Sequence, residues 1–312
     1  MPEFFTGRFP LAPQQPLYMH HPLMTTSTSF LAPIRTDAPI GVFDSGIGGL
    51  SVLSHIQTRL PHENLLYFAD SGFAPYGEKT EDFIVERSLI IADFLLQRGV
   101  KALVVACNTA TAAAIRALRE RYPALALVGV EPGLKPAAIL SKSRIVGVLA
   151  TERTINSSKF NLLREQVSAA TGARFMSQAC IGLADQIEEG ELASPATAAL
   201  VQHYVAPLIA QGADTLVLGC THYPFVQTLI EACICQATSE AITIIDTGEP
   251  VARQLARLLT ERNLLTTSIE EGKLQAFTTG SETALSSAFS ILLKLRPAIT
   301  CITTPSLIKI TR

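Results

Sequence analysis

Short apolar runs alternate along most of the chain with longer stretches in which apolar residues recur at helical spacing. The short runs are rich in branched and aromatic residues and are bounded by polar or glycine-containing segments, which is typical of strands buried on both faces. They predict strands over Ile40–Phe43, Leu65–Ala69, Ala102–Ala106, Leu125–Val130, Ile145–Ala150, Arg174–Ser177, Thr215–Gly219 and Ile242–Asp246.

The longer stretches predict amphipathic helices. Thr80, followed by Glu81 and Asp82, has the composition of a helix start, with a capping side chain and acidic residues in the first turn. Regular alternation of strands and helices indicates an α/β fold with mostly parallel sheets. The predicted helices are Leu50–Leu60, Glu81–Arg98, Thr111–Arg121, Ile155–Ala170, Pro195–Gln211, Pro224–Cys235 and Pro250–Arg262.

The first 39 residues do not follow this pattern. The stretch from Pro2 to Pro39 is rich in Pro, Ser and Thr, carries few charges and shows neither helical nor strand periodicity. We therefore expect an N-terminal extension over residues 1–39, with regular structure starting at Ile40. The remaining length is ample for two domains with large buried cores.

Composition argues against several classes of partner. The chain has 25 Lys and Arg residues against 27 Asp and Glu, with no basic block, so neither nucleic acid nor an anionic membrane surface is indicated. Trp is absent, which argues against a base-stacking platform. No apolar run is long enough to cross a bilayer, so no membrane partner is expected.

The cysteines indicate reduced thiols. Six cysteines in 312 residues are too few for a disulfide framework, and the N-terminus lacks the basic and apolar regions of a signal peptide. We therefore expect a cytoplasmic protein whose thiols are available for chemistry. Four of them are interpreted as ordinary small apolar residues, namely Cys180, Cys233, Cys235 and Cys301.

The other two cysteines occupy equivalent positions in two similar segments. LVVACNTAT (103–111) and LVLGCTHYP (216–224) each place a cysteine directly after a buried strand and before a helix. Ligands of open α/β sheets bind at the carboxyl ends of strands, and a helix N-terminus favours a thiolate. We therefore expect Cys107 and Cys220 to be reactive thiols with lowered pKa values, facing each other across a domain interface.

Each reactive cysteine has a neighbour that could handle a proton. His222 lies two residues beyond Cys220, and Asp44 ends the first strand, at the same sheet edge as Cys107. The glycine-rich turn Ser45–Gly49 lacks the spacing of a nucleotide-binding loop, but its N–H groups could hold a carboxylate. Further hydrogen bonds could come from Ser45, Asn108, Thr109, Thr221 and His222, a set that suits a small anionic ligand.

Five ordered motifs resemble those of the glutamate racemase family. They are FDSGIGGLSV (43–52), APYGEK (74–79), VVACNTAT (104–111), GVLATERT (147–154) and VLGCTHYP (217–224), and the resemblance weakens from about Leu264. It implies two flavodoxin-like domains with the active site at their interface. The first domain would comprise residues 40–132 plus 247–312, and the second residues 133–246.

The resemblance also assigns roles to residues. Cys107 and Cys220 would be the two catalytic bases, acting on D- and L-glutamate respectively, with Asp44 assisting the first and His222 the second. No pyridoxal phosphate, other cofactor or metal would take part. The substrate site would be lined by Asp44, Ser45, Pro75, Tyr76, Gly77, Asn108, Thr109, Thr221, His222 and an acidic residue that is Glu188 or, alternatively, Glu189.

The family's biology supplies further expectations. The product, D-glutamate, would be used for bacterial peptidoglycan and hence for cell-wall biogenesis and cell shape. Family members are commonly homodimers. APYGEK resembles the proteobacterial subgroup that responds to UDP-N-acetylmuramoyl-L-alanine, so this precursor is a candidate activator.

Three other functions compete with glutamate racemisation. A sister racemase, such as one acting on aspartate, would share the paired cysteines. A cysteine hydrolase would use Cys220 and His222 but would leave Cys107 without a role. A nucleotide-binding module would use the glycine-rich turn.

Overall fold

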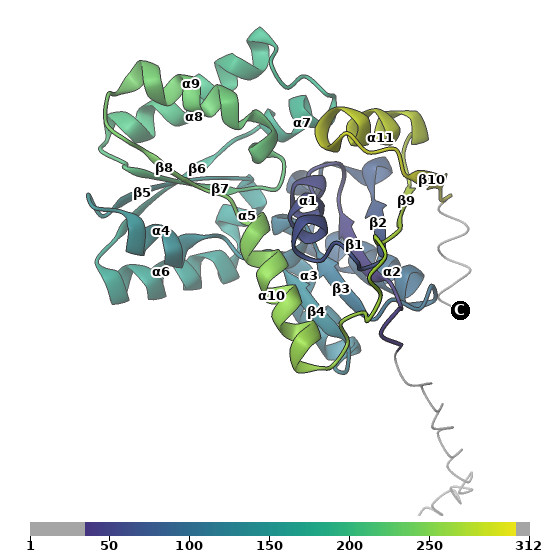
Figure 1. Ribbon diagram of the computed structural model, residues 1–312. Helices are drawn as coiled ribbons and strands as arrows, with labels where there is room; N and C mark the ends of the chain where they lie inside the picture. Colours follow the sequence, from purple (N-terminus) through teal and green to yellow (C-terminus); the bar gives the residue numbers. More distant parts are fainter. Residues whose placement is uncertain (1–34, 304–312) are drawn as a thin grey trace, which may run out of the picture. The chain divides into compact units, whose positions relative to one another are not determined.

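Two parallel sheets organise the chain in the computed structural model, which describes residues 35–303 (Figure 1). The larger sheet has the strand order β10-β9-β2-β1-β3-β4, and the smaller has the order β6-β5-β7-β8. Neighbouring strands pair in parallel throughout both sheets. The strands are β1 (Ile40–Asp44), β2 (Leu65–Ala69), β3 (Ala102–Val105), β4 (Ala126–Gly129), β5 (Ile145–Ala150), β6 (Arg174–Ala179), β7 (Thr215–Gly219), β8 (Thr243–Ile245), β9 (Leu274–Thr278) and β10 (Ala298–Cys301).

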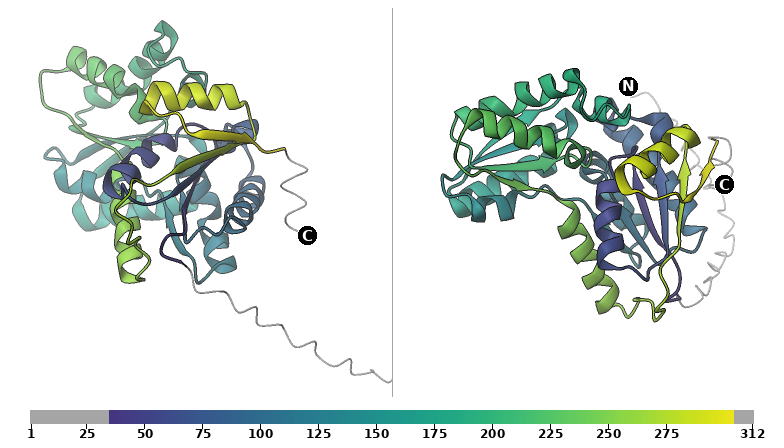
Figure 2. Two further views of the ribbon diagram at one scale, coloured as in Figure 1. Left: turned by 45° about the vertical axis from the view of Figure 1, so that its right-hand side comes forward. Right: turned by 45° about the horizontal axis from the view of Figure 1, so that its top comes forward.

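Helices cover both faces of each sheet (Figure 2). The first lobe is the larger sheet with α1 (Leu50–Arg59), α2 (Glu81–Leu96), α3 (Asn108–Arg121), α10 (Gly248–Glu261) and α11 (Glu282–Ala288). The second lobe is the smaller sheet with α4 (Leu134–Leu140), α5 (Glu152–Asn156), α6 (Ser158–Thr171), α7 (Leu183–Glu188), α8 (Pro195–Ala210) and α9 (Gln227–Ala237). Short helices are η1 (Ser71–Phe73), η2 (Tyr76–Glu78), η3 (Tyr223–Val226) and η4 (Phe289–Leu293).

Burial on both faces explains the continuous apolar runs in the sequence. In the first lobe, α1 and α10 pack Leu53 and Leu255 against Val42 on one face of the sheet, whereas α2 and α3 lie on the other face with Phe43. In the second lobe, α8 and α9 cover one face and α4 and α6 cover the other. Every residue of β1 and of β7 is buried as a result.

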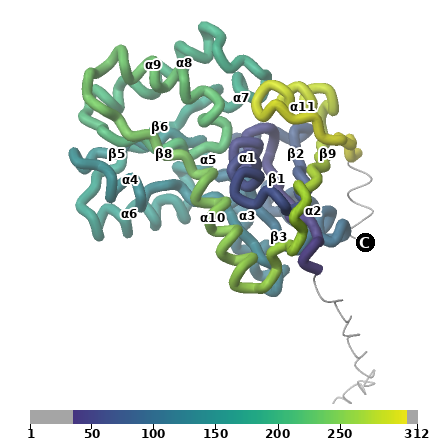
Figure 3. The backbone as a smooth tube through the Cα atoms, in the orientation of Figure 1, coloured from purple at the N-terminus to yellow at the C-terminus, as the bar shows by residue number. Residues whose placement is uncertain are grey.

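The chain passes between the lobes twice. It enters the second lobe between β4 and α4 and returns between β8 and α10. The returning segment then adds β9 beside β2, and β10 at the edge of the larger sheet (Figure 3). The first lobe is therefore built from two parts of the sequence that lie far apart.

The predicted alternation of strands and helices is confirmed, with each predicted strand present within a few residues of its predicted limits. The Thr80 cap is also confirmed, because its hydroxyl accepts a hydrogen bond from the Phe83 N–H at 3.3 Å. The single helix predicted over Ile155–Ala170 is wrong. The extended backbone of Ser157 separates α5 from α6, and its hydroxyl caps the Phe160 N–H.

Several elements lacked a recognisable sequence pattern. The helices are short, and exposed residues interrupt the apolar runs of both strands; these elements are α4, α7, β9, α11 and β10. The first 34 residues of the predicted N-terminal extension lie outside the described residues. Within residues 35–303, no helix has both the length and the apolar character needed to span a membrane.

A buried ion pair ties the amino-terminal edge of the larger sheet together. The Lys101 ammonium lies 2.5 Å from the Glu63 carboxylate, and both side chains are almost completely buried. Lys101 also donates to the Thr36 carbonyl, while Glu63 accepts from the Thr266 N–H at 2.9 Å. Lys101 and Glu63 therefore neutralise each other's charge. The pair lies at the amino-terminal ends of the strands, opposite the ends at which Asp44 and Cys107 are found.

We predict that Lys101→Met lowers the free energy of unfolding by about 3–5 kcal/mol, because it leaves the Glu63 carboxylate buried without its counter-charge. Urea unfolding followed by circular dichroism measures this change. The double variant Lys101→Met/Glu63→Gln should recover a large part of the loss. Arg116→Met, which removes an exposed surface partner of Glu120, should change stability by less than about 0.5 kcal/mol. A loss below about 1 kcal/mol in the single Lys101 variant would contradict the interpretation.

Candidate active site

A cavity of about 240 Å³ opens between the lobes at the carboxyl ends of β1, β3 and β7. This volume suits a small molecule. From the first lobe it is lined by Ser45, Ser71, Ala74, Pro75, Tyr76, Gly77, Cys107, Asn108 and Thr109. From the second lobe it is lined by Thr151, Ala184, Asp185, Glu188, Glu189, Cys220, Thr221 and His222.

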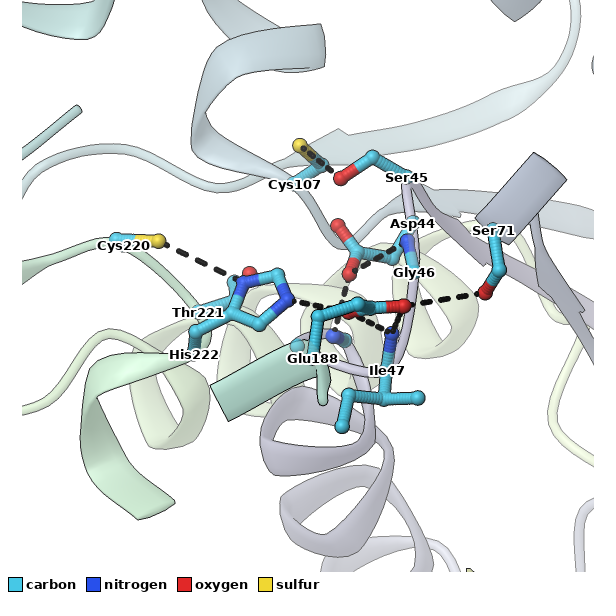
Figure 4. Close-up of polar contacts among 12 residues, drawn as sticks. Asp44, Ser45, Gly46, Ile47, Ser71, Cys107, Glu188, Cys220, Thr221 and His222 are labelled. Atoms are coloured by element: carbon cyan, nitrogen blue, oxygen red, sulfur yellow. Dashed lines mark hydrogen bonds and ion pairs between the residues drawn. The ribbon is translucent and has the colours of Figure 1, made fainter. Parts of the chain in front are cut away.

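Cys107 follows β3 and caps α3. Its sulfur accepts a hydrogen bond from the Ala110 N–H at 3.4 Å. The sulfur also lies 3.7 Å from the Ser45 hydroxyl (Figure 4). Burial raises the pKa of the Cys107 thiol well above its usual range, and the nearby Asp44 carboxylate raises it further. The prediction of a lowered pKa is therefore wrong for Cys107, because burial and a like charge outweigh the helix N-terminus.

Asp44 ends β1 and is completely buried. One carboxylate oxygen accepts hydrogen bonds from the Gly49 N–H at 2.8 Å and the Gly46 N–H at 3.3 Å, whereas the other oxygen has no hydrogen-bond partner. Burial raises the pKa of Asp44, although His222 and the Gly49 N–H act in the opposite direction. Asp44 is not among the residues that line the cavity, so the structure does not support its predicted contact with the substrate.

Cys220 follows β7 and begins a chain of contacts through an imidazole. Its sulfur lies 3.7 Å from Nδ1 of His222, and Nε2 of His222 lies 2.8 Å from Oε2 of Glu188 (Figure 4). Burial alone would lower the pKa of His222, but Cys220 and Glu188 outweigh it and hold this pKa well above 6.5. Burial likewise opposes ionisation of Glu188, but His222 and the Ile47 N–H hold its pKa below the usual value. The geometry favours an imidazolium–carboxylate pair.

Glu188 also joins the two lobes. From the end of α7 its carboxylate accepts hydrogen bonds from the Ile47 N–H at 3.0 Å and the Ser71 hydroxyl at 3.2 Å, both in the first lobe. The sequence left Glu188 and Glu189 as candidates for the acidic residue of the site, and it is Glu188 that makes these contacts. Glu189, which follows it, also lines the cavity.

The glycine-rich turn allows this close approach. A Cβ atom on Gly46 would lie 2.2 Å from the Glu188 carboxylate, and one on Gly48 would lie 2.3 Å from the His222 ring. The N–H groups of Gly46 and Gly49 bind Asp44, and that of Ile47 binds Glu188. Carboxylates of the protein therefore occupy these three N–H groups of the turn, and binding of a ligand carboxylate by the turn stays a prediction for its other N–H groups.

The segment carrying Pro75, Tyr76 and Gly77 forms another wall, with a cis peptide bond between Ala74 and Pro75. The Tyr76 hydroxyl donates to the buried Asp70 carboxylate at 2.5 Å. Arg87 donates two hydrogen bonds to the same carboxylate, at 2.6 and 2.9 Å. This buried network fixes Tyr76 within the first lobe.

Asn108 offers unused hydrogen-bonding capacity. Both polar atoms of its side-chain amide are buried without a partner, and the residue lines the cavity. Buried polar groups without partners are rare in folded proteins, so they indicate a polar ligand. Next to it, Thr109 meets Thr151 across the lobe boundary, with 3.0 Å between their hydroxyl oxygens.

Three polar lining residues were not predicted, namely Ser71, Thr151 and Asp185. Thr151 directly follows β5, and the same position after a strand pointed to Cys107 and Cys220, so this signal could have found it. Ser71 and Asp185 lie in short helices and had no such signal. The described residues contain no cluster of three or more His, Cys, Asp or Glu side chains arranged to hold a metal ion.

Comparison with known proteins identifies a family and relatives that match most of the described residues. Residues 40–255 match the model of the Asp/Glu/Hydantoin racemase family. The glutamate racemase of Ectopseudomonas mendocina is 54% identical over 233 residues, which cover 75% of this chain and 86% of the relative.

Solved structures agree with this relationship. Glutamate racemase isoform RacE1 from Bacillus anthracis superimposes with a TM-score of 0.77 at 32% identity, covering 87% of this chain and 99% of the other. Escherichia coli glutamate racemase, in complex with L-glutamate and the activator UDP-MurNAc-ala, gives 0.73 at 30% identity, covering 85% and 98%. These likenesses confirm the predicted fold class, two flavodoxin-like α/β domains with mostly parallel sheets. The chain thus belongs to the Asp/Glu/Hydantoin racemase family and is an isomerase related to the glutamate racemases.

Proposed function

We propose that this protein interconverts L- and D-glutamate without a cofactor, using Cys107 and Cys220 as an acid/base pair. The observation that carries the proposal is their placement. The two thiols follow strands of different lobes, line one cavity and each have a potential proton-handling neighbour. Inversion at an α-carbon requires removal of a proton from one face and return of a proton to the other, which two such groups can perform without turning the substrate.

The proton balance of the reaction is simple. One cysteine, as thiolate, takes the α-proton and becomes a thiol, leaving a planar carbanion. The other cysteine, as thiol, gives its proton to the opposite face and becomes a thiolate. The roles reverse with reaction direction, with Cys220 acting on L-glutamate and Cys107 on D-glutamate.

The surroundings of the two thiols differ. Burial beside Asp44 raises the pKa of Cys107, whereas Cys220 lies 3.7 Å from the imidazole of His222, whose pKa is held well above its usual value. A cationic imidazole beside Cys220 suits the thiolate that must remove the α-proton of L-glutamate. For the reverse direction, the substrate ammonium entering the cavity would favour a thiolate at Cys107.

Acid/base catalysis alone does not suffice for so weak a carbon acid. A positioned acid or base typically contributes about 10²–10⁴-fold. Neutral donors must therefore stabilise the charge that develops at the α-carboxylate, and we assign this role to Asn108, Thr109 and Thr221. Ser45, Pro75, Tyr76 and Gly77 complete the proposed substrate site, with His222 and Glu188 on the opposite wall.

A cysteine hydrolase is the second candidate. Cys220, His222 and Glu188 follow one another in hydrogen-bond order, as nucleophile, base and orienting acid do in hydrolases. That function leaves Cys107 without a role. It would release hydrolysis products with no exchange of an α-proton.

The domain limits, the metabolic role, the location and the oligomeric state are proposed from the resemblance to the glutamate racemases. We place the domain limits at residues 40–132 plus 247–312 for the first domain and 133–246 for the second, which agrees with the division of strands between the two sheets. The D-glutamate would supply peptidoglycan synthesis in the cytoplasm, and the enzyme would be a homodimer.

Cys107→Ser and Cys220→Ser should each lower the rate of glutamate racemisation by roughly 10³-fold, because a serine hydroxyl is far less acidic than a thiol. Polarimetry from each enantiomer measures the loss, and circular dichroism checks that the fold is retained. Cys235→Ser, at an exposed thiol, should keep the full rate. Near-normal racemisation by either active-site variant would refute the two-thiol mechanism.

Glu188→Gln should lower kcat by about 10- to 100-fold, the size expected for a lost charge-assisted hydrogen bond. The pKa of His222 should fall because its counter-ion is gone, so the alkaline limb of the pH–rate profile should move to lower pH. Glu189→Gln changes the next residue, which lines the same cavity, and should alter kcat by less than about threefold. Equal effects of the two substitutions would contradict the assigned role of Glu188.

UDP-N-acetylmuramoyl-L-alanine should raise the rate of racemisation, since the similar Escherichia coli enzyme was solved with this activator. Assays with and without the precursor test this, using the full chain and a version that starts at Asp37. Equal activation of both would show that the N-terminal extension has no part in the response. An unchanged rate in the full chain would remove the precursor from the proposal.

A further inference from the structure

Residues 71–79 form a segment of the first lobe that meets the second lobe at both of its ends. At one end the Ser71 hydroxyl donates to Glu188. At the other end Nη2 of Arg153 donates to the carbonyl oxygen of Lys79. Between these two contacts lie Pro75, Tyr76 and Gly77, which line the cavity. The segment therefore closes one side of the cavity while it is linked to the opposite lobe.

The Lys79–Arg153 contact joins two walls of the site. Arg153 lies in α5, and the residue that caps this helix, Thr151, lines the cavity. The space between the walls is narrow here, since a Cβ atom on Gly77 would lie 3.6 Å from the Thr151 side chain. A shift at Arg153 would therefore change the separation of the two walls.

A smaller hollow of about 90 Å³ adjoins the cavity at this boundary. The two spaces share Pro75, Gly77, Thr151, Ala184 and Asp185, which come from both lobes. The hollow also reaches the exposed residues Glu78, Glu152 and Ile181. It has the position of a passage from solvent to the cavity.

Arg153 is held by few contacts for a partly buried guanidinium. Its Nη2 has the Lys79 carbonyl, whereas its Nε is buried with no hydrogen-bond partner. Within its own lobe, the segment is fixed at Tyr76 by Asp70 and Arg87. That network does not extend to Lys79, whose carbonyl instead accepts the hydrogen bond from Arg153 of the second lobe.

We propose that Arg153 is a positioning residue that holds residues 74–79 against α5 and thereby controls how tightly the site closes over its substrate. This inference rests on the proposed function. Arg153 takes no part in proton transfer, because the two thiols and their neighbours lie on other elements. Its loss should weaken the binding of both enantiomers while the chemical step proceeds.

Arg153→Met removes the donor and keeps most of the apolar stem. Its KM for L-glutamate and for D-glutamate should rise roughly 10-fold, the size of one hydrogen bond from a charged donor, with kcat within about twofold of the wild type. Because the equilibrium constant of racemisation is 1, kcat/KM must fall by the same factor in both directions, which checks the assay. Arg153→Lys keeps the charge and a donor and should recover most of the affinity.

Amide hydrogen exchange without substrate supplies a second readout that does not depend on activity. Residues 74–79 should exchange faster in Arg153→Met than in the wild type, whereas strand β7 should be unchanged. Arg116→Met is the matched control, because it removes an exposed arginine of α3 whose ion-pair partner is Glu120, and it should alter neither KM nor exchange.

The proposal requires both changes in Arg153→Met. An unchanged KM, an unchanged exchange rate at residues 74–79, or a fall in kcat without a rise in KM would each overturn it. If the wild-type chain does not racemise glutamate, the proposed function fails, and the exchange comparison still decides whether Arg153 restrains the segment.

Discussion

The carboxylate of Glu188 lies where the two lobes meet, and the geometry of the site depends on it. It accepts a backbone N–H and a hydroxyl from the first lobe while it holds the imidazole of the second. Three donors compensate for its burial, so it remains charged in a place where an isolated carboxylate would be neutral. The approach of the lobes, the orientation of His222 and the surroundings of Cys220 therefore follow from one group.

This arrangement makes the two halves of the site electrostatically unequal. On the Cys220 side, Cys220 and Glu188 hold the pKa of His222 well above its usual value, whereas on the Cys107 side burial raises the pKa of the Asp44 carboxyl above its usual value. The charged residues that line the cavity are carboxylates apart from His222, so an anionic substrate must be held by neutral dipoles from both lobes. Dipoles from both lobes can reach one substrate only when the lobes are close together. Substrate binding therefore depends on the contacts between the lobes that Glu188 and Arg153 make.

Much of this architecture could be predicted from the sequence, and the failures have physical causes. Asp44 and Cys107 lie at the carboxyl ends of the neighbouring strands β1 and β3, and Cys220 and His222 follow β7 of the other sheet, so simple α/β geometry brings each pair together. The short helices could not be predicted, because three to seven residues carry too little periodicity, and Ser71 and Asp185 were missed with them. The direction of the Cys107 pKa shift was also wrong. A helix N-terminus is visible in a sequence, whereas full burial beside Asp44 is not.

The glycine-rich turn illustrates the same limit. Its glycines suggested a binding loop, and they are indeed required for a close approach, but the groups that approach are Glu188 and His222. Both residues lie more than a hundred positions further along the chain, and only the folded structure shows that they reach the turn.

Isotope exchange at the α-carbon distinguishes two thiols on opposite faces of the substrate from a single base. The reduced wild-type protein is incubated with L-glutamate in deuterium oxide without added cofactor, and both enantiomers are analysed at early times. Newly formed D-glutamate should carry deuterium at the α-carbon while remaining L-glutamate keeps its proton, since one thiol removes the proton and the other returns one from solvent. Equal deuterium in both enantiomers from the start, or no loss of optical rotation, would refute the two-thiol mechanism.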